Sequence, residues 1–210
     1  MRSRSAPDHG RFPVLRLGRF VIVPASLKRP ARLSPRQFRI VLVQGQAFGS
    51  GRHESTRLML SVIEAHPPLG QTVLDVGAGS GILGFACLRL GASRVECVEL
   101  EGAACAELRR NRDLNAVPAR RMPVVCGSFP LKGGLRGPYP LVLANLITPV
   151  LCSLMSALAA RVQGGGALLC GGIHTDAEAR AVLDAARRRG LVLQGRARLR
   201  RWNVLRFIRP

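Results

Sequence analysis

The sequence predicts an α/β protein built on a mostly parallel, seven-stranded sheet that ends in an antiparallel hairpin. From Thr72 onward, short apolar runs alternate with helix-forming stretches, which is typical of parallel strands joined by right-handed crossovers. A glycine-rich turn follows the first of these runs and opens a helix, as in sheets that bind nucleotide-like ligands. Two more apolar runs, separated only by a tight basic turn, close the chain. These three observations together predict the sheet and its terminal hairpin.

The expected elements follow from apolar runs bounded by glycine, proline and polar residues. In the alternating part we expect strands at 72–76, 94–99, 122–126, 140–145 and 167–171. Helices are expected at 82–90, 102–114, 149–162 and 176–189, the last of them ended by Gly190. The terminal hairpin is expected at 191–197 and 202–208.

The chain divides into three expected parts. Residues 1–18 have few apolar anchors and are expected to form a basic, flexible tail. Residues 19–66 contain two expected strands, a polar loop with several glycines, and a helix over 54–65 that ends before two prolines. Residues 67–210 form the expected α/β core.

Composition narrows the class of protein. A chain of 210 residues with 47% hydrophobic content can bury one full core. The six cysteines occur singly, without a C-x-x-C pair or a histidine at ligand spacing, so we expect reduced, mostly buried thiols in a cytoplasmic protein and no metal site. The uncharged stretch 141–160 is too often interrupted by polar residues to span a membrane. The N-terminus lacks the apolar region of a secretory signal, although a mitochondrial transit peptide remains an alternative.

The net charge of +20 favours a polyanion such as RNA or a ribosome nearby. The basic residues concentrate at the ends, because residues 1–36 carry nine of them against one acid and residues 187–210 carry nine with none. However, 30 of the 32 basic residues are arginine in a chain rich in alanine and glycine, so codon bias explains the charge as well. Any binding to RNA would be directed at its backbone and would depend on salt.

The glycine-rich turn is the strongest candidate binding site. It contains the pattern Asp75-x-Gly77-x-Gly79-x-Gly81, in which glycines permit a tight turn and a close approach of ligand to backbone. Glu99 ends the next strand and could accept hydrogen bonds from ribose hydroxyls. This pattern fits S-adenosylmethionine (SAM), whereas the overlapping pattern Gly79-x-Gly81-x-x-Gly84 formally fits a dinucleotide. A plain strand, turn and helix with a surface glutamate is the structural alternative.

Two polar residues at strand ends are candidates for contact with cofactor or substrate. Asn145 ends the fourth strand of the alternating part, where open α/β sheets present ligands, and is the candidate catalytic residue that orients an acceptor amine. Asp75 either reaches the ammonium group of the cofactor's methionyl part or holds the turn, and we favour the first.

Among the residues with rings, two have both a functional and a structural interpretation, and two are expected to be structural. His53 either orients substrate or cofactor, or only caps the helix that follows. Phe48 either lies against the adenine or anchors its own loop. Trp202 and Phe207 are expected in the core of the terminal hairpin.

Several segments together resemble PrmA, the methyltransferase family of large-subunit ribosomal protein eleven. They agree in order and spacing, and they read RFVIVP from Arg19, AFGSGRHEST from Ala47, LDVGAGSGILGFACLRLGA from Leu74 and ANLI from Ala144. The resemblance implies a Rossmann-like class I fold and SAM contacts at Thr56, Gly77, Glu99 and Asn145. The family usually has aspartate where this chain has Glu99. It also carries an N-terminal recognition domain, whereas about 18 residues precede the match here.

The expected function is therefore SAM-dependent methylation of lysine or α-amines on a ribosomal or translation-associated protein. Binding of the cofactor is expected at Thr56, Asp75, Gly77, Gly79, Gly81, Glu99 and Asn145. The alternatives are a methyltransferase of RNA or a small molecule and a SAM-binding, ribosome-associated module without turnover. An NAD-dependent oxidoreductase is a further alternative, although no catalytic domain follows the nucleotide-binding half.

Overall fold

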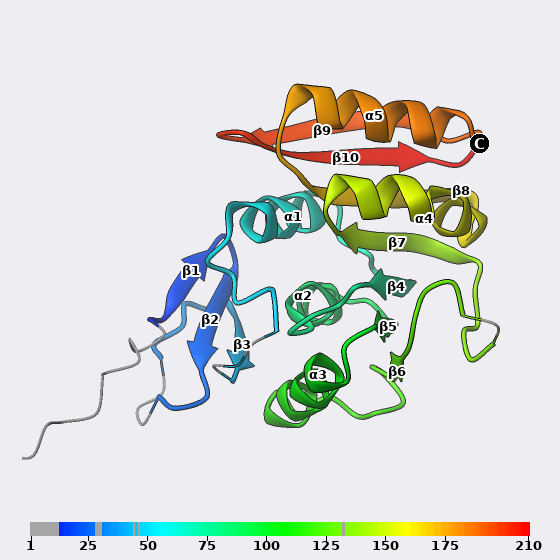
Figure 1. Ribbon diagram of the computed structural model, residues 1–210. Coiled ribbons are helices and arrows are strands. Elements are labelled where there is room, and N and C mark those ends of the chain that lie inside the picture. Colours follow the sequence, from blue (N-terminus) through cyan, green and yellow to red (C-terminus); the bar gives the residue numbers. More distant parts are fainter. Residues whose placement is uncertain (1–12, 28–30, 44, 46, 132) are drawn as a thin grey trace, which may run out of the picture.

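The computed structural model describes residues 13–27, 31–43, 45, 47–131 and 133–210. Their strands are β1 (Leu15–Leu17), β2 (Phe20–Pro24), β3 (Phe38–Leu42), β4 (Thr72–Val76), β5 (Arg94–Glu99), β6 (Val124–Cys126), β7 (Tyr139–Asn145), β8 (Val162–Ile173), β9 (Val192–Leu199) and β10 (Trp202–Ile208). Their helices are α1 (Glu54–Ala65), α2 (Ile82–Arg89), α3 (Gly102–Leu114), α4 (Thr148–Ala160) and α5 (Asp176–Arg187) (Figure 1).

The main sheet has seven strands in the order β6-β5-β4-β7-β8-β10-β9. Strands β6, β5, β4, β7 and β8 are parallel, whereas β10 is antiparallel to both of its neighbours. The predicted parallel sheet with an antiparallel terminal hairpin is thus confirmed. Because β10 runs against β8, the start of β10 lies at the same edge of the sheet as the carboxyl ends of the parallel strands.

Helices cover both faces of this sheet (Figure 1). One apolar core packs the sheet against α1, α2 and α3 and contains Met59, Phe85 and Leu108. The other packs it against α4 and α5 and contains Leu151 and Val182. The two cores follow the alternation of side chains along each strand, which sends successive residues to opposite faces.

Strands β1, β2 and β3 form a separate small sheet, in which β1 is antiparallel and β3 parallel to β2. Two asparagines of the α3 region join it to the core: Asn115 accepts a hydrogen bond from the N–H of Val41 at 2.9 Å, and Asn111 accepts one from Val43 at 2.8 Å. The expected tail over residues 1–18 is corrected at its end, because Leu15–Leu17 pair with β2. Residues 1–12 of that tail lie outside the described residues.

The expectation that all cysteines are reduced is wrong for two of them, because Cys105 and Cys126 form a disulfide. Strand β6 lies beside β5, and α3 begins just after β5, so the first turn of α3 comes close to the end of β6. The two Cα atoms are 6.1 Å apart, within the normal range for a disulfide. The other four cysteines are free.

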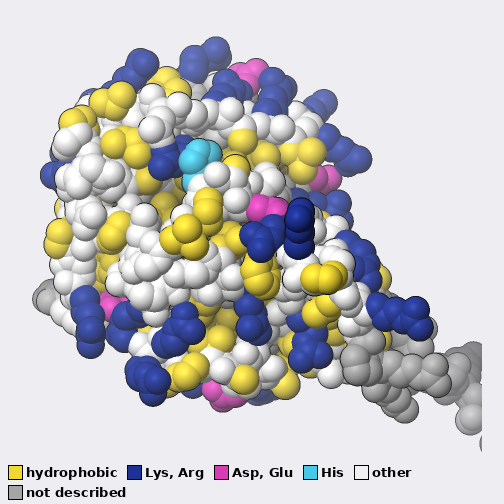
Figure 2. All heavy atoms as spheres, turned by 180° about the vertical axis from the view of Figure 1, so that it is seen from behind, with side chains coloured by type: hydrophobic (Ala, Val, Ile, Leu, Met, Phe, Trp, Pro, Cys, Tyr) yellow, Lys and Arg dark blue, Asp and Glu magenta, His cyan; other side chains and the backbone are white. Residues whose placement is uncertain are grey.

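The surface of the described residues is strongly basic. Figure 2 shows Arg side chains spread over the face behind that of Figure 1, with few acidic side chains between them. Part of the charge near the C-terminus is compensated internally, because Asp176 pairs with Arg196 and Arg198, and Glu54 pairs with Arg200 at 3.1 Å. Among the described residues, no helix combines the length and apolar character needed to cross a membrane.

Candidate active site at the carboxyl edge of the sheet

The glycine turn joins β4 to α2 in a conformation that only glycine adopts readily. Gly77, Gly79 and Gly81 have φ values of +70°, +54° and +83°. A Cβ atom on Gly79 would lie 2.3 Å from the carbonyl oxygen of Phe48, which is backbone and cannot move aside. The N–H of Ser80 donates to the same oxygen at 2.9 Å. The turn and the loop before α1 are therefore packed directly against each other.

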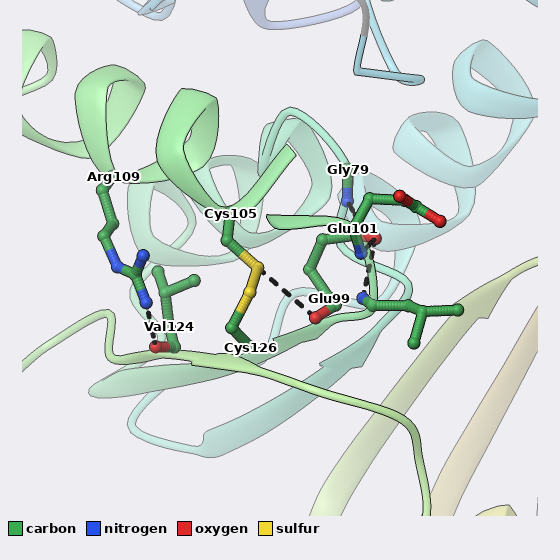
Figure 3. The surroundings of a disulfide bond; sticks show 8 residues. Gly79, Glu99, Glu101, Cys105, Arg109, Val124 and Cys126 are labelled. Carbon is green, nitrogen blue, oxygen red and sulfur yellow. Dashed lines mark hydrogen bonds between the residues drawn. A yellow bond between two sulfur atoms is a disulfide. The ribbon is translucent and has the colours of Figure 1, made fainter. Parts of the chain in front are cut away.

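The carboxylate of Glu99 is held in one position by three backbone N–H groups. Its Oε2 accepts from Gly79 at 2.8 Å, and its Oε1 accepts from Leu100 at 2.8 Å and from Glu101 at 3.1 Å (Figure 3). A carboxylate offers about four acceptor positions, so this geometry leaves acceptor capacity for a ligand. Glu99 also lines the cavity described next, which makes it a fixed, negatively charged acceptor on its wall.

A cavity of about 910 Å³ opens beside the turn, at the carboxyl ends of β4, β5 and β7. It brings together four of the residues predicted from the sequence, which are Gly77, Gly79, Glu99 and Asn145. The loop before α1 and the start of α4 complete its wall. Its size falls in the range of pockets that bind a small-molecule cofactor, and its position matches the ligand crevice of open α/β sheets.

Asn145 lines this cavity and carries an unpaired acceptor. It is the last residue of β7, and its side-chain Oδ1 is buried without a hydrogen-bond partner among the described residues. A buried acceptor without a partner costs free energy, so it indicates a group reserved for a ligand. The neighbouring strand lies close, because a Cβ atom on Gly171 would be 2.8 Å from this oxygen.

Two other predicted contacts do not line the cavity. Thr56 is fully buried in α1 and its Oγ1 has no hydrogen-bond partner in the described chain, whereas the adjacent Ser55 faces the cavity. Gly81 is enclosed, because a Cβ atom there would lie 3.0–3.2 Å from side chains of the apolar core. Contact of Thr56 and Gly81 with the cofactor therefore stays a prediction.

Asp75 differs from its predicted position, because it lies beneath the turn and away from the cavity lining. Alternation along β4 places it on the same face as Val73, toward α2, and its Oδ2 is buried with no hydrogen-bond partner in the part of the chain that the structure describes. Burial, together with the negative charge of Glu99, raises its pKa from the ordinary 3.8 to about 7. The prediction that Asp75 reaches the ammonium group of a ligand is therefore not supported by this geometry.

The raised pKa of Asp75 makes the free energy of unfolding depend on pH. Between about pH 4 and pH 7 the folded protein keeps a proton on Asp75 that the unfolded chain releases, so stability should fall as pH rises through this window. At roughly 1.4 kcal/mol per pKa unit, the total loss is on the order of 4 kcal/mol. Urea unfolding from pH 5 to pH 8 should show this fall in the wild type and its absence in Asp75→Asn.

The exposed Asp113 provides the matched control, because its side chain is 69% exposed. Asp113→Asn should keep the wild-type dependence on pH. Parallel stability curves for wild type and Asp75→Asn would show that Asp75 does not cause the change.

Three rings surround the mouth of the cavity, and sequence reasoning identified only two of them as candidates. Phe48 and His53 have ring centroids 5.3 Å apart, and His53 and Trp202 are 4.4 Å apart. His53 also caps α1 by accepting from the N–H of Ser55 at 3.2 Å, so its capping role is confirmed. Trp202 is half-buried: it packs against the apolar core, as expected, and it also lines the cavity, which was not expected. Phe207 is fully buried, as expected.

The antiparallel direction of β10 is the signal that predicts a position for Trp202 at the cavity edge of the sheet. A strand that runs against its parallel neighbours begins at the edge where they end. Trp202 is the first residue of β10 and therefore reaches the same edge as Asn145.

Comparison with known proteins identifies the family. The family model for ribosomal protein L11 methyltransferase (PrmA) matches residues 9–210. The chain belongs to the PrmA family. A ribosomal protein L11 methyltransferase of Prochlorococcus marinus is 38% identical over 183 residues, covering 84% of this chain and 60% of the relative. The corresponding protein of Geobacter metallireducens is 34% identical over 196 residues, covering 93% and 62%. The chain thus spans about three fifths of these PrmA relatives.

A solved structure supports the same assignment. The ribosomal protein L11 methylase of Lactobacillus delbrueckii subsp. bulgaricus superimposes with a TM-score of 0.81 at 26% identity, covering 93% of this chain and 98% of that one. Another solved methyltransferase, complexed with S-adenosylhomocysteine, shares the fold, with a TM-score of 0.60 at 10% identity, covering 75% of this chain and 50% of that one. The fold of this PrmA-family chain is that of class I SAM-dependent methyltransferases, as predicted.

The residues of the cavity fit SAM. Glu99 offers a fixed carboxylate with acceptor capacity for a ribose hydroxyl, and Gly77, Gly79 and Asn145 line the same cavity. The described part of this PrmA-family chain contains no cluster of three or more residues suited to hold a metal ion.

Proposed function

We propose that this chain binds SAM in the cavity at the carboxyl edge of the sheet and methylates amines of a ribosomal protein of the L11 type. The observation that carries the proposal is the meeting of Gly77, Gly79, Glu99 and Asn145 at one cavity in a chain of the PrmA family. The named relatives are methyltransferases of ribosomal protein L11, which supports the choice of acceptor. A cytoplasmic location would follow from an acceptor of that class.

The residues around the cavity suit a methyl transfer that depends on holding the cofactor and the acceptor amine in line. When bound, SAM supplies an electrophilic methyl group on its sulfonium. Glu99 would hold the ribose, and the glycine turn would admit the rest of the cofactor. Oδ1 of Asn145 would accept an N–H bond from the neutral amine, so that the lone pair of the amine points at the methyl group. Such alignment supplies a large part of the rate without an acid or a base.

The apolar part of the cavity would help to provide a neutral amine. Val76, Val98, Leu146 and Ile147 line the cavity together with the rings at its mouth. A lysine or α-amino group that enters such surroundings loses hydration, which lowers its pKa and favours the form with a free lone pair. The same apolar wall would keep water away from the reacting methyl group.

The basic surface favours a second candidate, methylation of RNA. Arg side chains far outnumber acidic side chains on the face in Figure 2, and such a surface binds nucleic acid through its phosphates. Proximity to RNA is also compatible with a ribosomal protein as acceptor.

Incubation with methyl-labelled SAM separates the two candidates. The acceptors are purified ribosomal protein L11 and ribosomal RNA, each offered separately and then in intact ribosomes. We expect label on the protein that is lost after protease treatment and kept after nuclease treatment, with a mass increase of 14 Da per methyl group. Label that nuclease removes would establish RNA as the acceptor. Binding of SAM with no label on any acceptor would favour the module without turnover.

A further inference from the structure

A disulfide joins two walls of the cofactor cavity. Cys105 lies in the first turns of α3, directly after Ala103 and Ala104, which line the cavity. Cys126 ends β6 and is followed by Gly127 and two further lining residues. Figure 3 shows the bond between the helix and this strand, next to Glu99. The covalent link therefore holds together two segments that both contact the cavity.

The disulfide also touches the residue that we assign to the cofactor ribose. The sulfur of Cys105 lies 3.4 Å from the carbonyl oxygen of Glu99, and the N–H of Gly127 donates to that oxygen at 2.9 Å. In the sheet, Glu99 is also the partner of Cys126. An oxidised sulfur carries no proton, whereas a reduced Cys105 could donate one to the carbonyl. A change at this sulfur pair therefore acts on the backbone of Glu99, the same residue that carries the carboxylate of the cavity.

The two sulfur-bearing residues differ in access to solvent. Cys105 is fully buried, whereas Cys126 is exposed. All six cysteines lie within the described residues, and Cys126 is the only exposed one. Thiol–disulfide exchange requires that a thiolate reach one sulfur of the bond. The Cys126 end of the bond lies at the surface, where a thiolate can approach, whereas the Cys105 end is buried.

We propose that Cys105 and Cys126 form an exchange site for small thiols of the glutathione class, and that its oxidation state sets the affinity of the cavity for the cofactor. A thiolate attacks the sulfur of Cys126, Cys105 leaves as a thiolate and takes up a proton, and a mixed disulfide remains on Cys126. A second thiolate attacks the sulfur of the small thiol in this mixed disulfide. It releases the Cys126 thiolate and the small-molecule disulfide. The oxidant for the reverse reaction is that same small-molecule disulfide.

Oxidation should tighten cofactor binding. The bond keeps the α3 wall and the wall after β6 in the arrangement seen here, so less ordering is required when the cofactor binds. Reduction should weaken binding of S-adenosylhomocysteine by about fivefold, the lower end of typical coupling between sites. This inference depends on the proposed cofactor site.

Calorimetric titration with S-adenosylhomocysteine tests the inference on protein equilibrated with glutathione disulfide or with dithiothreitol. Cys126→Ser should bind with the affinity of the reduced wild type in both conditions. Cys152→Ser is the matched control, because Cys152 is free and half-buried, and it should keep the full response. Equal affinity in both states, or a response that persists in Cys126→Ser, would overturn the inference and leave the cofactor site intact.

Two further measurements test the disulfide and its effect on the cavity walls independently of the binding titration. After treatment with glutathione disulfide, alkylation in denaturant should spare Cys105 and Cys126, and modification of both would overturn the inference. Absence of binding in either state would instead remove the proposed cofactor site. Hydrogen exchange of residues 100–101 and 127–129 would then report whether the oxidation state still changes these walls, and unchanged exchange would overturn the inference independently.

Discussion

Replacing Glu99 with alanine is expected to weaken binding of S-adenosylhomocysteine by at least tenfold. The carboxylate is fixed by N–H groups of Gly79, Leu100 and Glu101, and it lines the cavity. Each charge-assisted hydrogen bond to a ribose hydroxyl is worth about 1.5–3 kcal/mol. Loss of one such bond already exceeds the roughly 1.4 kcal/mol that corresponds to a tenfold change. Isothermal titration calorimetry measures the effect directly.

Two further variants separate binding from folding. Glu99→Asp keeps the carboxylate and should lose much less affinity than Glu99→Ala. Glu96→Gln removes a buried carboxylate from the same strand, at a site that bonds Tyr139 and Arg94 rather than facing the cavity. Its affinity for the ligand should match the wild type, even where its thermal stability falls. Unchanged affinity in Glu99→Ala would rule out the ribose contact.

The main features of the fold could be predicted because local signals coincide with the global arrangement. The helix over 54–65 has a capping residue before it and two prolines after it, and the structure gives the same bounds. The glycine turn and the short basic turn of the hairpin are equally local. Each of these boundaries depends on the backbone conformations that a few adjacent residues allow, and the residue types alone indicate those conformations.

Features that depend on contacts between distant segments were missed. Leu15–Leu17 is a strand only because β2 pairs with it, and Arg16 interrupts its apolar character. The Cys105–Cys126 bond joins residues 21 positions apart, and nothing in that spacing distinguishes it from two free thiols. It becomes predictable only when β6 is known to lie beside β5, and the order of strands in a sheet is not a local property.

The residues of the candidate site that lie at strand ends could be predicted, whereas the position of Asp75 inside a strand could not. Gly77, Gly79, Glu99 and Asn145 follow from one rule, since each lies at or just after the carboxyl end of a parallel strand. Asp75 lies inside its strand, and there the alternation of side chains decides which way it points. The alternation turns it toward α2, into a buried position that raises its pKa instead of placing it at the cavity.

Replacing Asn145 with alanine is expected to lower the rate of methyl transfer about 100-fold or more, the usual effect of removing one preorganised polar group. Asn145 lines the cavity, and its Oδ1 is buried and unpaired within the described chain, so we propose that a small turn of its amide lets this acceptor align the amine of the substrate. Alignment matters most in the transition state, so kcat should fall more than KM rises. Initial rates with methyl-labelled SAM and ribosomal protein L11 measure both parameters.

Affinity for the cofactor distinguishes positioning of the amine from damage to the cavity. Asn145→Ala should bind S-adenosylhomocysteine within about threefold of the wild type, because the amine contact is absent from that complex. Asn145→Asp keeps an acceptor oxygen at the same place and should retain more activity than the alanine variant. Ser153→Ala changes another polar residue of the cavity wall and should leave kcat near the wild-type value. If kcat stays unchanged in Asn145→Ala, the amine is held by other groups, and the backbone carbonyls that follow β7 become the next acceptors to consider.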